Sequence, residues 1–362
     1  MRATRLQLRA AALVNNARCA RQAAGAASLF AMVKADGYGH GLEFVGRTLA
    51  AEVDGFGVAC LQEAHRLRAA GVDAPLMLLE GPFAADEIAA AAAIGAELVI
   101  HSDWQLALLE QAPRTAPLSV WLKVDTGMHR LGLPPARVAE AAARLRSQSW
   151  LTLSGLVSHF ASADQPDDPL GAQQLACVQR LAAELDVPFS AANSAALLRY
   201  PASRGCRVRP GIMLYGSSPL LGQSAASLDL LPTQQLLADV IAINDVPTGD
   251  TVGYGGRWRA PRDSRIAVVS IGYGDGYPRH APDGTPVAIQ GVDGSWHQTT
   301  LTGRVSMDML TVDVTDLPAA QIGSTVELWG DQVSVDDVAA HCQTISYELF
   351  CRLTARPRRE YC

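Results

Sequence analysis

The segment Ser28–Lys34, SLFAMVK, is apolar on both faces of an extended chain and ends at a lysine. A strand with this pattern is buried on both sides, as in a parallel sheet whose faces are covered by helices. Between such runs, Ala-rich segments carry apolar residues at helical spacing. Seven further strand candidates follow: Asp54–Cys60, Ala74–Glu80, Ala96–His101, Leu118–Val124, Leu153–Phe160, Phe189–Ser194 and Arg207–Tyr215. The helix candidates include Leu61–Ala70, Asp86–Ile94, Pro135–Ser147 and Gln173–Leu185.

Eight repeats of strand and helix predict an α/β fold and, within that class, a closed (β/α)8 barrel of the TIM type. The alternative is an open doubly wound sheet, which needs a G-x-G-x-x-G turn after its first strand, and none follows Lys34. From about residue 229, short β-type runs separated by Gly, Pro and Asp take over, interrupted by one helical pattern at Val335–His341. We therefore expect two domains, a barrel over residues 1–228 and a mostly antiparallel β-domain over residues 229–362.

Composition excludes several classes of function. The 362 residues carry a net charge of −6, which gives no basic footprint for nucleic acid. No apolar run reaches the roughly 18 residues of a membrane span, and the N-terminus lacks the apolar core of a secretory signal. The seven cysteines are scattered without a C-x-x-C pair. We therefore expect no metal site, no disulfide framework, no membrane or nucleic-acid partner, and a cytoplasmic protein.

Lysine usage is the most informative count. Of the 30 basic residues only Lys34 and Lys123 are lysines, and the others are arginines. Arginine stays protonated at any accessible pH, whereas a desolvated lysine can lose its proton and act as a base or nucleophile. The two lysines are therefore candidates for chemistry that arginine cannot perform.

Polar residues gather where the predicted barrel strands end, which is the catalytic face of such barrels. Lys34 could form a Schiff base with an aldehyde, and Ser194 with the backbone amides of Gly211 and Ile212 could hold a phosphate. An aldehyde with a phosphate suggests pyridoxal phosphate, whose ring nitrogen needs a partner such as Arg209. A cation at that position disfavours protonation of the ring nitrogen.

With these residues in place, the sequence resembles a known family, the bacterial alanine racemases, over essentially the whole chain. The strongest match is AMVKADGYGHG at Ala31–Gly41, which is similar to the family's cofactor-lysine motif. The supporting motifs are KVDTGMHRLG (Lys123–Gly132), VSHFASAD (Val157–Asp164), ANSAA (Ala192–Ala196), VRPGIMLYG (Val208–Gly216), VGYGG (Val252–Gly256), SIGYGDGYPR (Ser270–Arg279) and GRVSMDM (Gly303–Met309). The resemblance implies a pyridoxal-phosphate enzyme that interconverts L-alanine and D-alanine.

The resemblance also implies roles for individual residues. Lys34 would hold the cofactor as an aldimine and act as the base for D-alanine, and Tyr254 would be the base for L-alanine on the opposite face. The phosphate would be bound by four residues, Tyr38, Ser194, Gly211 and Ile212.

Other residues of these motifs would contact the cofactor ring or the substrate. Arg209 would face the ring nitrogen, and His159 would pack beside the ring and help to fix Arg209. Arg130 would bridge the phenolic oxygen of the cofactor and the substrate carboxylate. Met307 would contact the substrate through its backbone, and Tyr273 would line the entrance.

In this family the active site is shared across a head-to-tail homodimer, so Lys34 would meet Tyr254, Tyr273 and Met307 of the other subunit. Lys123 resembles a lysine that is carbamylated in several members, where it positions the residue equivalent to Arg130. Some members also have a phosphate-binding tyrosine near the C-terminus, at the position where this chain has Ala355.

Two alternative functions would share some or all of these motifs. A broader-specificity amino-acid racemase would keep every motif and differ in the size of its substrate pocket. A non-catalytic pyridoxal-phosphate carrier can be a single barrel with one lysine, but it would lack the β-domain and Tyr254. Within the racemase reading, the enzyme could supply D-alanine for peptidoglycan or degrade it.

Overall fold

The computed structural model describes residues 4–113, 116–165 and 168–362, which form two compact units. One unit covers Leu13–Leu231, and the other combines the N-terminal residues up to Ala12 with Pro232–Cys362. The predicted barrel and β-domain are both present, which confirms the expected fold class. The division differs from the expected boundary at the N-terminus, because the first strand belongs to the β unit.

Eight parallel strands form the barrel in the spatial order β8-β7-β6-β5-β4-β3-β2-β9. Backbone bonds from Cys206 N–H to Phe189 O (3.0 Å) and from Arg209 N–H to Ala192 O (2.9 Å) join the two ends of this sheet. The strands are β2 (Ser28–Met32), β3 (Gly55–Val58), β4 (Leu76–Leu78), β5 (Ala96–Ile100), β6 (Leu118–Lys123), β7 (Leu151–Val157), β8 (Phe189–Ser190) and β9 (Arg207–Val208).

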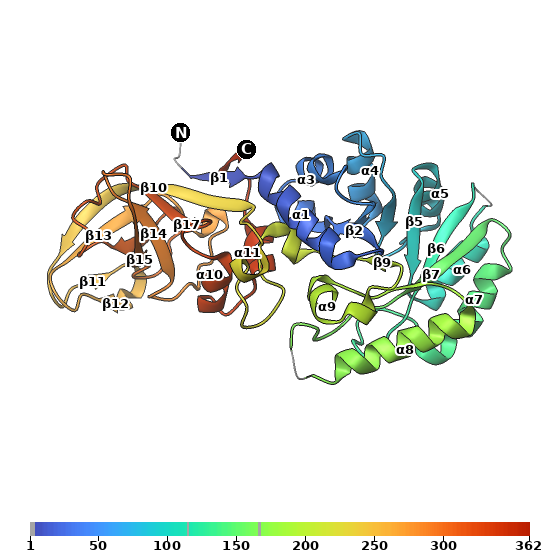
Figure 1. Ribbon diagram of the computed structural model, residues 1–362. Coiled ribbons are helices and arrows are strands. Elements are labelled where there is room, and N and C mark those ends of the chain that lie inside the picture. The colour runs from blue at the N-terminus through green and yellow to red at the C-terminus, as the bar shows by residue number, and fades with distance from the viewer. Residues whose placement is uncertain (1–3, 114–115, 166–167) are drawn as a thin grey trace. The chain divides into compact units, whose positions relative to one another are not determined.

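Helices cover the outside of the barrel, as Figure 1 shows for α7 and α8 beside β7. The helices pack on the sheet because each of them turns an apolar face toward it. Their bounds are α1 (Ala10–Ala24), α3 (Leu42–Leu49), α4 (Leu61–Ala69), α5 (Ala85–Ala93), α6 (Asp103–Gln111), α7 (Val138–Arg146), α8 (Leu170–Leu185) and α9 (Ser194–Arg199). The short segment α2 (Lys34–Tyr38), directly after β2, has left-handed backbone angles and does not form a covering helix. The 3-10 turns of this unit are η1 (Pro135–Arg137), η2 (Pro201–Ser203), η3 (Ile212–Tyr215) and η4 (Ala226–Leu228).

The last two barrel strands are shorter than the sequence predicts, and the reason is local. Pro210 has no N–H and cannot continue a ladder, so β9 ends early and Ile212–Tyr215 forms a 3-10 turn. The side chain of Asn193 accepts a hydrogen bond from Ala196 N–H (2.9 Å) and caps α9, which ends the extended segment after β8.

A charged cluster fills one layer of the barrel interior. The guanidinium of Arg207 pairs with Glu97, and Trp121 Nε1 donates to the same carboxylate (2.8 Å). The guanidinium also lies 3.7 Å from the ring centre of Phe30 and 4.6 Å from that of Trp121. Gly155 leaves room for Trp121, since a Cβ there would lie 2.5 Å from the indole. The charge of Arg207 is thus neutralised inside the barrel.

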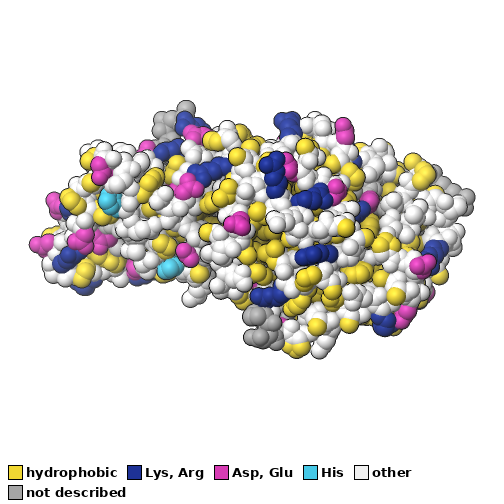
Figure 2. All heavy atoms as spheres, viewed as in Figure 1, with side chains coloured by type: hydrophobic (Ala, Val, Ile, Leu, Met, Phe, Trp, Pro, Cys, Tyr) yellow, Lys and Arg dark blue, Asp and Glu magenta, His cyan; other side chains and the backbone are white. Residues whose placement is uncertain are grey.

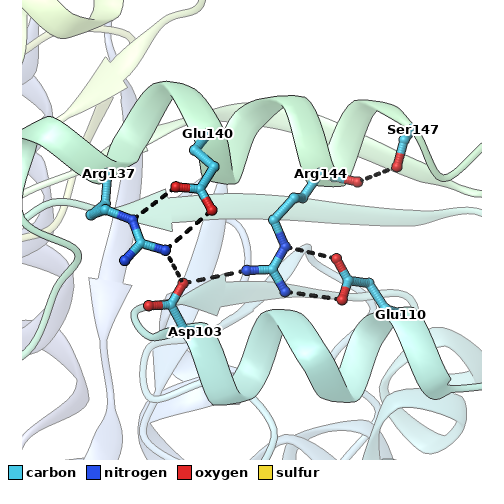
Figure 3. A network of polar contacts seen from close by, with 6 residues as sticks. All are labelled: Asp103, Glu110, Arg137, Glu140, Arg144 and Ser147. Atoms are coloured by element: carbon cyan, nitrogen blue, oxygen red, sulfur yellow. Dashed lines mark hydrogen bonds and ion pairs between the residues drawn. The ribbon is translucent and has the colours of Figure 1, made fainter.

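An ion-pair network links α6 to α7 on the outer surface (Figure 3). Arg144 makes a two-pronged contact with Glu110 (2.7 and 2.9 Å), and Asp103 accepts from both Arg137 and Arg144 at 3.3 Å. Arg137 also reaches Glu140 (2.9 Å). Such exposed pairs contribute about 1 kcal/mol or less each, so the network fixes two helices without dominating stability. Figure 2 shows the same mixture of acidic and basic side chains on the visible face.

The second unit is built on antiparallel pairing. Its one parallel pair among the described strands joins β1 to β18, and β1 also pairs antiparallel with β10. The strands are β1 (Arg5–Leu8), β10 (Gln234–Val246), β11 (Thr251–Val252), β12 (Trp258–Arg259), β13 (Ser264–Val269), β14 (Pro286–Gln290), β15 (Trp296–Thr300), β16 (Leu310–Asp313), β17 (Thr325–Trp329) and β18 (Arg358–Tyr361). The expected helix at Val335–His341 is α10, and a further helix, α11 (Ser346–Arg352), follows it; two 3-10 turns, η5 (Tyr254–Gly256) and η6 (Tyr273–Asp275), complete the unit. No helix among the described residues is long and apolar enough to cross a membrane.

Candidate active site

The barrel rim at the carboxyl ends of the strands collects the predicted site residues of this unit. Because all eight strands are parallel, these ends meet on one face. Lys34 follows β2, Lys123 ends β6, His159 follows β7, Ser194 begins α9 after β8, and Arg209 follows β9. Sequence positions that lie far apart therefore converge on one rim.

Lys34 opens an unusual turn. Ala35, Asp36, Gly37 and Tyr38 all have positive φ, between 52° and 63°, so the chain makes a left-handed turn directly after the lysine. A left-handed conformation costs about 1–2 kcal/mol for each residue that carries a Cβ. Clustered strain of this kind occurs at functional sites, where the surrounding structure holds it in place. Asp36 and Gly37 are residue types that adopt positive φ, but Ala35 and Tyr38 are not, so the full turn could not be predicted from the sequence.

Tyr38 and Ser194 form a polar cradle with the backbone after β9. The buried ring of Tyr38 stacks on Tyr215 with ring centres 4.5 Å apart. Ser194 Oγ accepts hydrogen bonds from Gly211 N–H (2.9 Å) and Met213 N–H (3.4 Å). A Cβ on Gly211 would lie 2.3 Å from Tyr38 Oη, so this position requires glycine. Two hydroxyls and a stretch of backbone without side-chain bulk are a donor set that fits a phosphate group.

Arg209 is buried at this rim. Its guanidinium donates to Ser190 Oγ, to Ser158 O (2.7 Å) and to Ala191 O (3.5 Å). Burial, with a smaller contribution from Arg207, lowers the pKa of Arg209 to about 10, so it stays charged at neutral pH. Within the described residues no carboxylate pairs with it, and its hydrogen bonds go to Ser190 and backbone carbonyls rather than to His159. A buried charge without a counter-charge is expensive unless a ligand compensates it.

Lys123 and His159 experience the same positive field. Burial and then the charges of Arg209, Arg130 and Lys34 lower the pKa of Lys123 to about 8. Burial and the same cations hold the pKa of His159 well below its usual range, so its imidazole is neutral. Lys123 and Arg130 also line one small hollow together with His159, so positive charge gathers at the rim and makes it a site for anions.

Arg130 is held by a tight loop after β6. Asp125 accepts hydrogen bonds from Gly127 N–H and His129 N–H (both 3.0 Å), and His129 adopts a positive φ of 55°. Arg130 is exposed, beside a small hollow. That hollow is lined by Lys123, Val124, Asp125, Thr126, Met128, Arg130, Leu131 and His159.

The β unit carries the remaining predicted residues on neighbouring loops. Tyr273 N–H donates to Ser306 O (3.0 Å) and Gly274 N–H to Met307 O (2.9 Å), so Tyr273 and Met307 lie side by side. The loop of Tyr254 packs nearby, since a Cβ on Gly253 would lie 3.4 Å from Arg304 N.

Arg356, which the sequence pattern does not single out, links the loops of Tyr273 and Met307. Arg356 pairs with Asp308 (2.6 Å) and with the buried Asp275 (3.4 Å), which itself accepts from Gly272 N–H (2.9 Å). Arg356 stands among other arginines near the C-terminus, which hides it in the sequence. Its neighbour Ala355 is exposed and carries no polar side-chain atom.

These donor sets fit pyridoxal phosphate within the barrel unit. Tyr38, Ser194 and the Gly211–Ile212 backbone suit its phosphate, Arg209 suits an unprotonated ring nitrogen, and Lys34 suits its aldehyde. Among the described residues, no group of three His, Cys, Asp or Glu side chains is arranged to hold a metal ion.

Replacing Gly211 with alanine should weaken binding of pyridoxal phosphate at least about tenfold, because the new Cβ collides with the Tyr38 hydroxyl inside the cradle. Titration of the cofactor-free variant with pyridoxal phosphate, followed by absorbance, measures this. An unchanged dissociation constant would show that the phosphate lies elsewhere. The Gly211→Ala, Tyr38→Phe double variant should be less impaired at the cradle than additivity predicts, since the phenylalanine lacks the colliding oxygen.

Comparison with known proteins agrees with both units. Residues 8–219 match the family model described as the N-terminal domain of alanine racemase, and residues 233–361 match that of its C-terminal domain. The chain is 54% identical to an alanine racemase of Alcanivorax borkumensis over 359 residues, covering 99% of each chain. It is 46% identical to a catabolic alanine racemase of Pseudomonas putida over 358 residues, again covering 99% of each. The crystal structure of the biosynthetic alanine racemase of Pseudomonas aeruginosa superposes with a TM-score of 0.96 at 46% identity, over 100% of both chains. The chain belongs to the alanine racemase family.

Proposed function

We propose that this protein is a pyridoxal-phosphate-dependent alanine racemase that interconverts L-alanine and D-alanine. The observation that carries the proposal is the barrel rim, where Lys34 and the buried Arg209 flank a phosphate cradle that includes Gly211, and where no carboxylate of the described residues pairs with Arg209. When bound, the cofactor delocalises the negative charge that remains on the α-carbon after its proton leaves. The family membership of both units supports the assignment.

Racemisation requires a proton to leave one face of the α-carbon and another to arrive on the opposite face. Lys34 is proposed to hold the cofactor and then to exchange a proton on the D side, and Tyr254 to do so on the L side. Arg209, still charged with a pKa of about 10, keeps the ring nitrogen from taking a proton. His159, which is neutral, would pack beside the cofactor ring without adding charge.

The substrate is proposed to be recognised by charge at one end and by size at the other. Arg130 attracts the alanine carboxylate and the phenolic oxygen of the cofactor, because both are anionic. Tyr273 and the backbone of Met307 limit the space for the substrate side chain. Ala355 offers no hydroxyl to the phosphate, so Tyr38, Ser194, Gly211 and Ile212 bind it without a further tyrosine.

A homodimer with shared sites is part of the proposal. Tyr254 is 68% exposed and Met307 54% exposed on the β unit. On the barrel, Phe83, Trp104 and Leu131 follow β4, β5 and β6 and are exposed too. Apolar groups exposed on both units are typical of surfaces that a partner covers, and a two-fold dimer covers both at once.

The cellular role is proposed from the reaction and the cysteines. The seven cysteines are free thiols, and we infer from this a reducing compartment such as the cytoplasm. D-alanine made there would serve peptidoglycan synthesis, and the reverse reaction would degrade it. The relatives named biosynthetic and catabolic are 48% and 46% identical to this chain, which supports the shared reaction rather than one direction.

Proton NMR of the purified protein with L-alanine in D2O tests the reaction. We expect D-alanine that carries deuterium at the α-carbon. Tyr254→Phe should slow exchange from L-alanine by about a hundredfold or more, and Lys34→Ala should abolish covalent attachment of the cofactor. The absence of any exchange in the cofactor-loaded protein would contradict the proposal and favour a carrier. Equal rates with larger amino acids would favour a broader racemase.

We further propose that Lys123 carries a carbamate beside Arg130. Carbamylation requires a neutral amine. With a pKa of about 8, Lys123 is partly neutral near pH 8, where an ordinary lysine is almost fully protonated. At constant dissolved carbon dioxide, the modification should increase as the pH rises through about 8, because protonated Lys123 cannot react. Carbon-13 NMR with labelled bicarbonate should show a carbamate signal that Lys123→Ala removes. A signal that survives this substitution, or none above that pH, would refute the modification.

A further inference from the structure

Side chains of α4 form hydrogen bonds with the left-handed turn after Lys34. Glu63, in the first turn of that helix, accepts a hydrogen bond from Ala35 N–H through Oε1 (2.7 Å). Its other oxygen, Oε2, accepts from Ala59 N–H (2.8 Å). One carboxylate thus joins the residue after Lys34 to the residue after β3.

Arg66, one helical turn further along α4, holds the next residue of the turn. Its Nη2 donates to Asp36 Oδ1 (2.7 Å), and it pairs with Glu43 of α3 (2.7 and 2.9 Å). These acidic partners raise the pKa of Arg66, and Arg66 lowers that of Glu43. Ala35 and Asp36, which are consecutive in the strained turn, are therefore bonded to two side chains that lie three residues apart on α4.

The turn needs such external bonds because its own geometry is unfavourable for residues with a Cβ. It makes internal bonds from Gly37 N–H to Val33 O (2.8 Å), from Gly39 N–H to Ala35 O (3.0 Å) and from Gly41 N–H to Asp36 O (2.9 Å). None of these uses the N–H of Ala35, which goes to Glu63 instead. If Ala35 took an ordinary right-handed or extended conformation, the direction in which the chain leaves Lys34 would change.

We propose that Glu63 is a positioning residue that holds the left-handed turn and thereby fixes where Lys34 presents its amine, with Arg66 as its assistant. Glu63 itself touches no reacting atom. A carboxylate is required because two backbone donors need two acceptor oxygens, whereas a glutamine side chain has one. The inference rests on the proposed role of Lys34 as the cofactor lysine.

The test compares Glu63→Ala and Glu63→Gln with Gln62→Ala, a matched change of the exposed neighbour on the same helix. Hydrogen–deuterium exchange of the cofactor-loaded protein reads the amides of Ala35 and Ala59 directly. In Glu63→Ala we expect exchange at both to rise at least about tenfold, with Glu63→Gln intermediate and Gln62→Ala unchanged. Because misplacement of a reacting group slows chemistry, kcat should fall at least about tenfold while KM changes less than about twofold.

A rescue variant separates positioning from loss of structure. Glycine takes a positive φ without a steric penalty, so Ala35→Gly in the Glu63→Ala background should recover kcat about fivefold. The same change in the wild-type background should not raise it. If Glu63→Ala does not fold, the Glu63→Gln comparison carries the same test.

Equal amide exchange in Glu63→Ala and Gln62→Ala would overturn the inference, as would faster exchange with an unchanged kcat. The role of Lys34 is checked separately, by reducing the cofactor onto the protein with borohydride and mapping the labelled residue. Labelling elsewhere would refute the proposed function, whereas the exchange result reports on the Glu63 contact in either case.

Discussion

The burial of the Arg209 guanidinium at the barrel rim, without a carboxylate beside it among the described residues, is the constraint on which the rest of the site depends. Moving a charge out of water is costly unless an opposite charge or strong hydrogen bonds compensate it. Here Ser190 and two backbone carbonyls compensate it in part. Deeper in the barrel, Glu97 neutralises Arg207, so the uncompensated charge remains at the rim.

The positive charge at the rim acts on two titratable neighbours, Lys123 and His159. Together with burial, which is the larger cause, it lowers the pKa of His159 well below its usual range and that of Lys123 to about 8. The phosphate and phenolic oxygen of a bound cofactor would offset this positive charge, and its unprotonated ring nitrogen would accept a hydrogen bond from Arg209. A substrate carboxylate would offset the charge as well. In the proposed mechanism the barrel unit binds the cofactor and supplies one proton-exchanging group, and the β unit supplies the exposed Tyr254.

The architecture could be read from the sequence because its signals are local. Each barrel strand is a short apolar run, and the residues at the strand ends share one rim once the strands are parallel. The failures have physical causes. Pro210 ends β9 early, and β1 joins the β unit through partners more than 200 residues away, which no local pattern reveals.

The candidate site was predictable where a residue type carries the chemistry and hidden where backbone geometry carries it. The two lysines among 30 basic residues pointed to Lys34 and Lys123. The left-handed turn, in contrast, includes Ala35 and Tyr38, whose residue types do not indicate positive φ, and side chains of α4 bond to it. Glu63 and Arg66 look like ordinary residues of an exposed helix in the sequence.

We propose that Lys34 of one subunit works with Tyr254 of another. Hybrid dimers of a Lys34→Ala subunit and a Tyr254→Phe subunit, isolated with two different affinity tags, test it most directly. A site shared across a two-fold dimer gives each hybrid one intact site and one doubly altered site, hence about half of the wild-type activity. Hybrids as inactive as the two parent variants would show that Lys34 and Tyr254 do not act across the dimer.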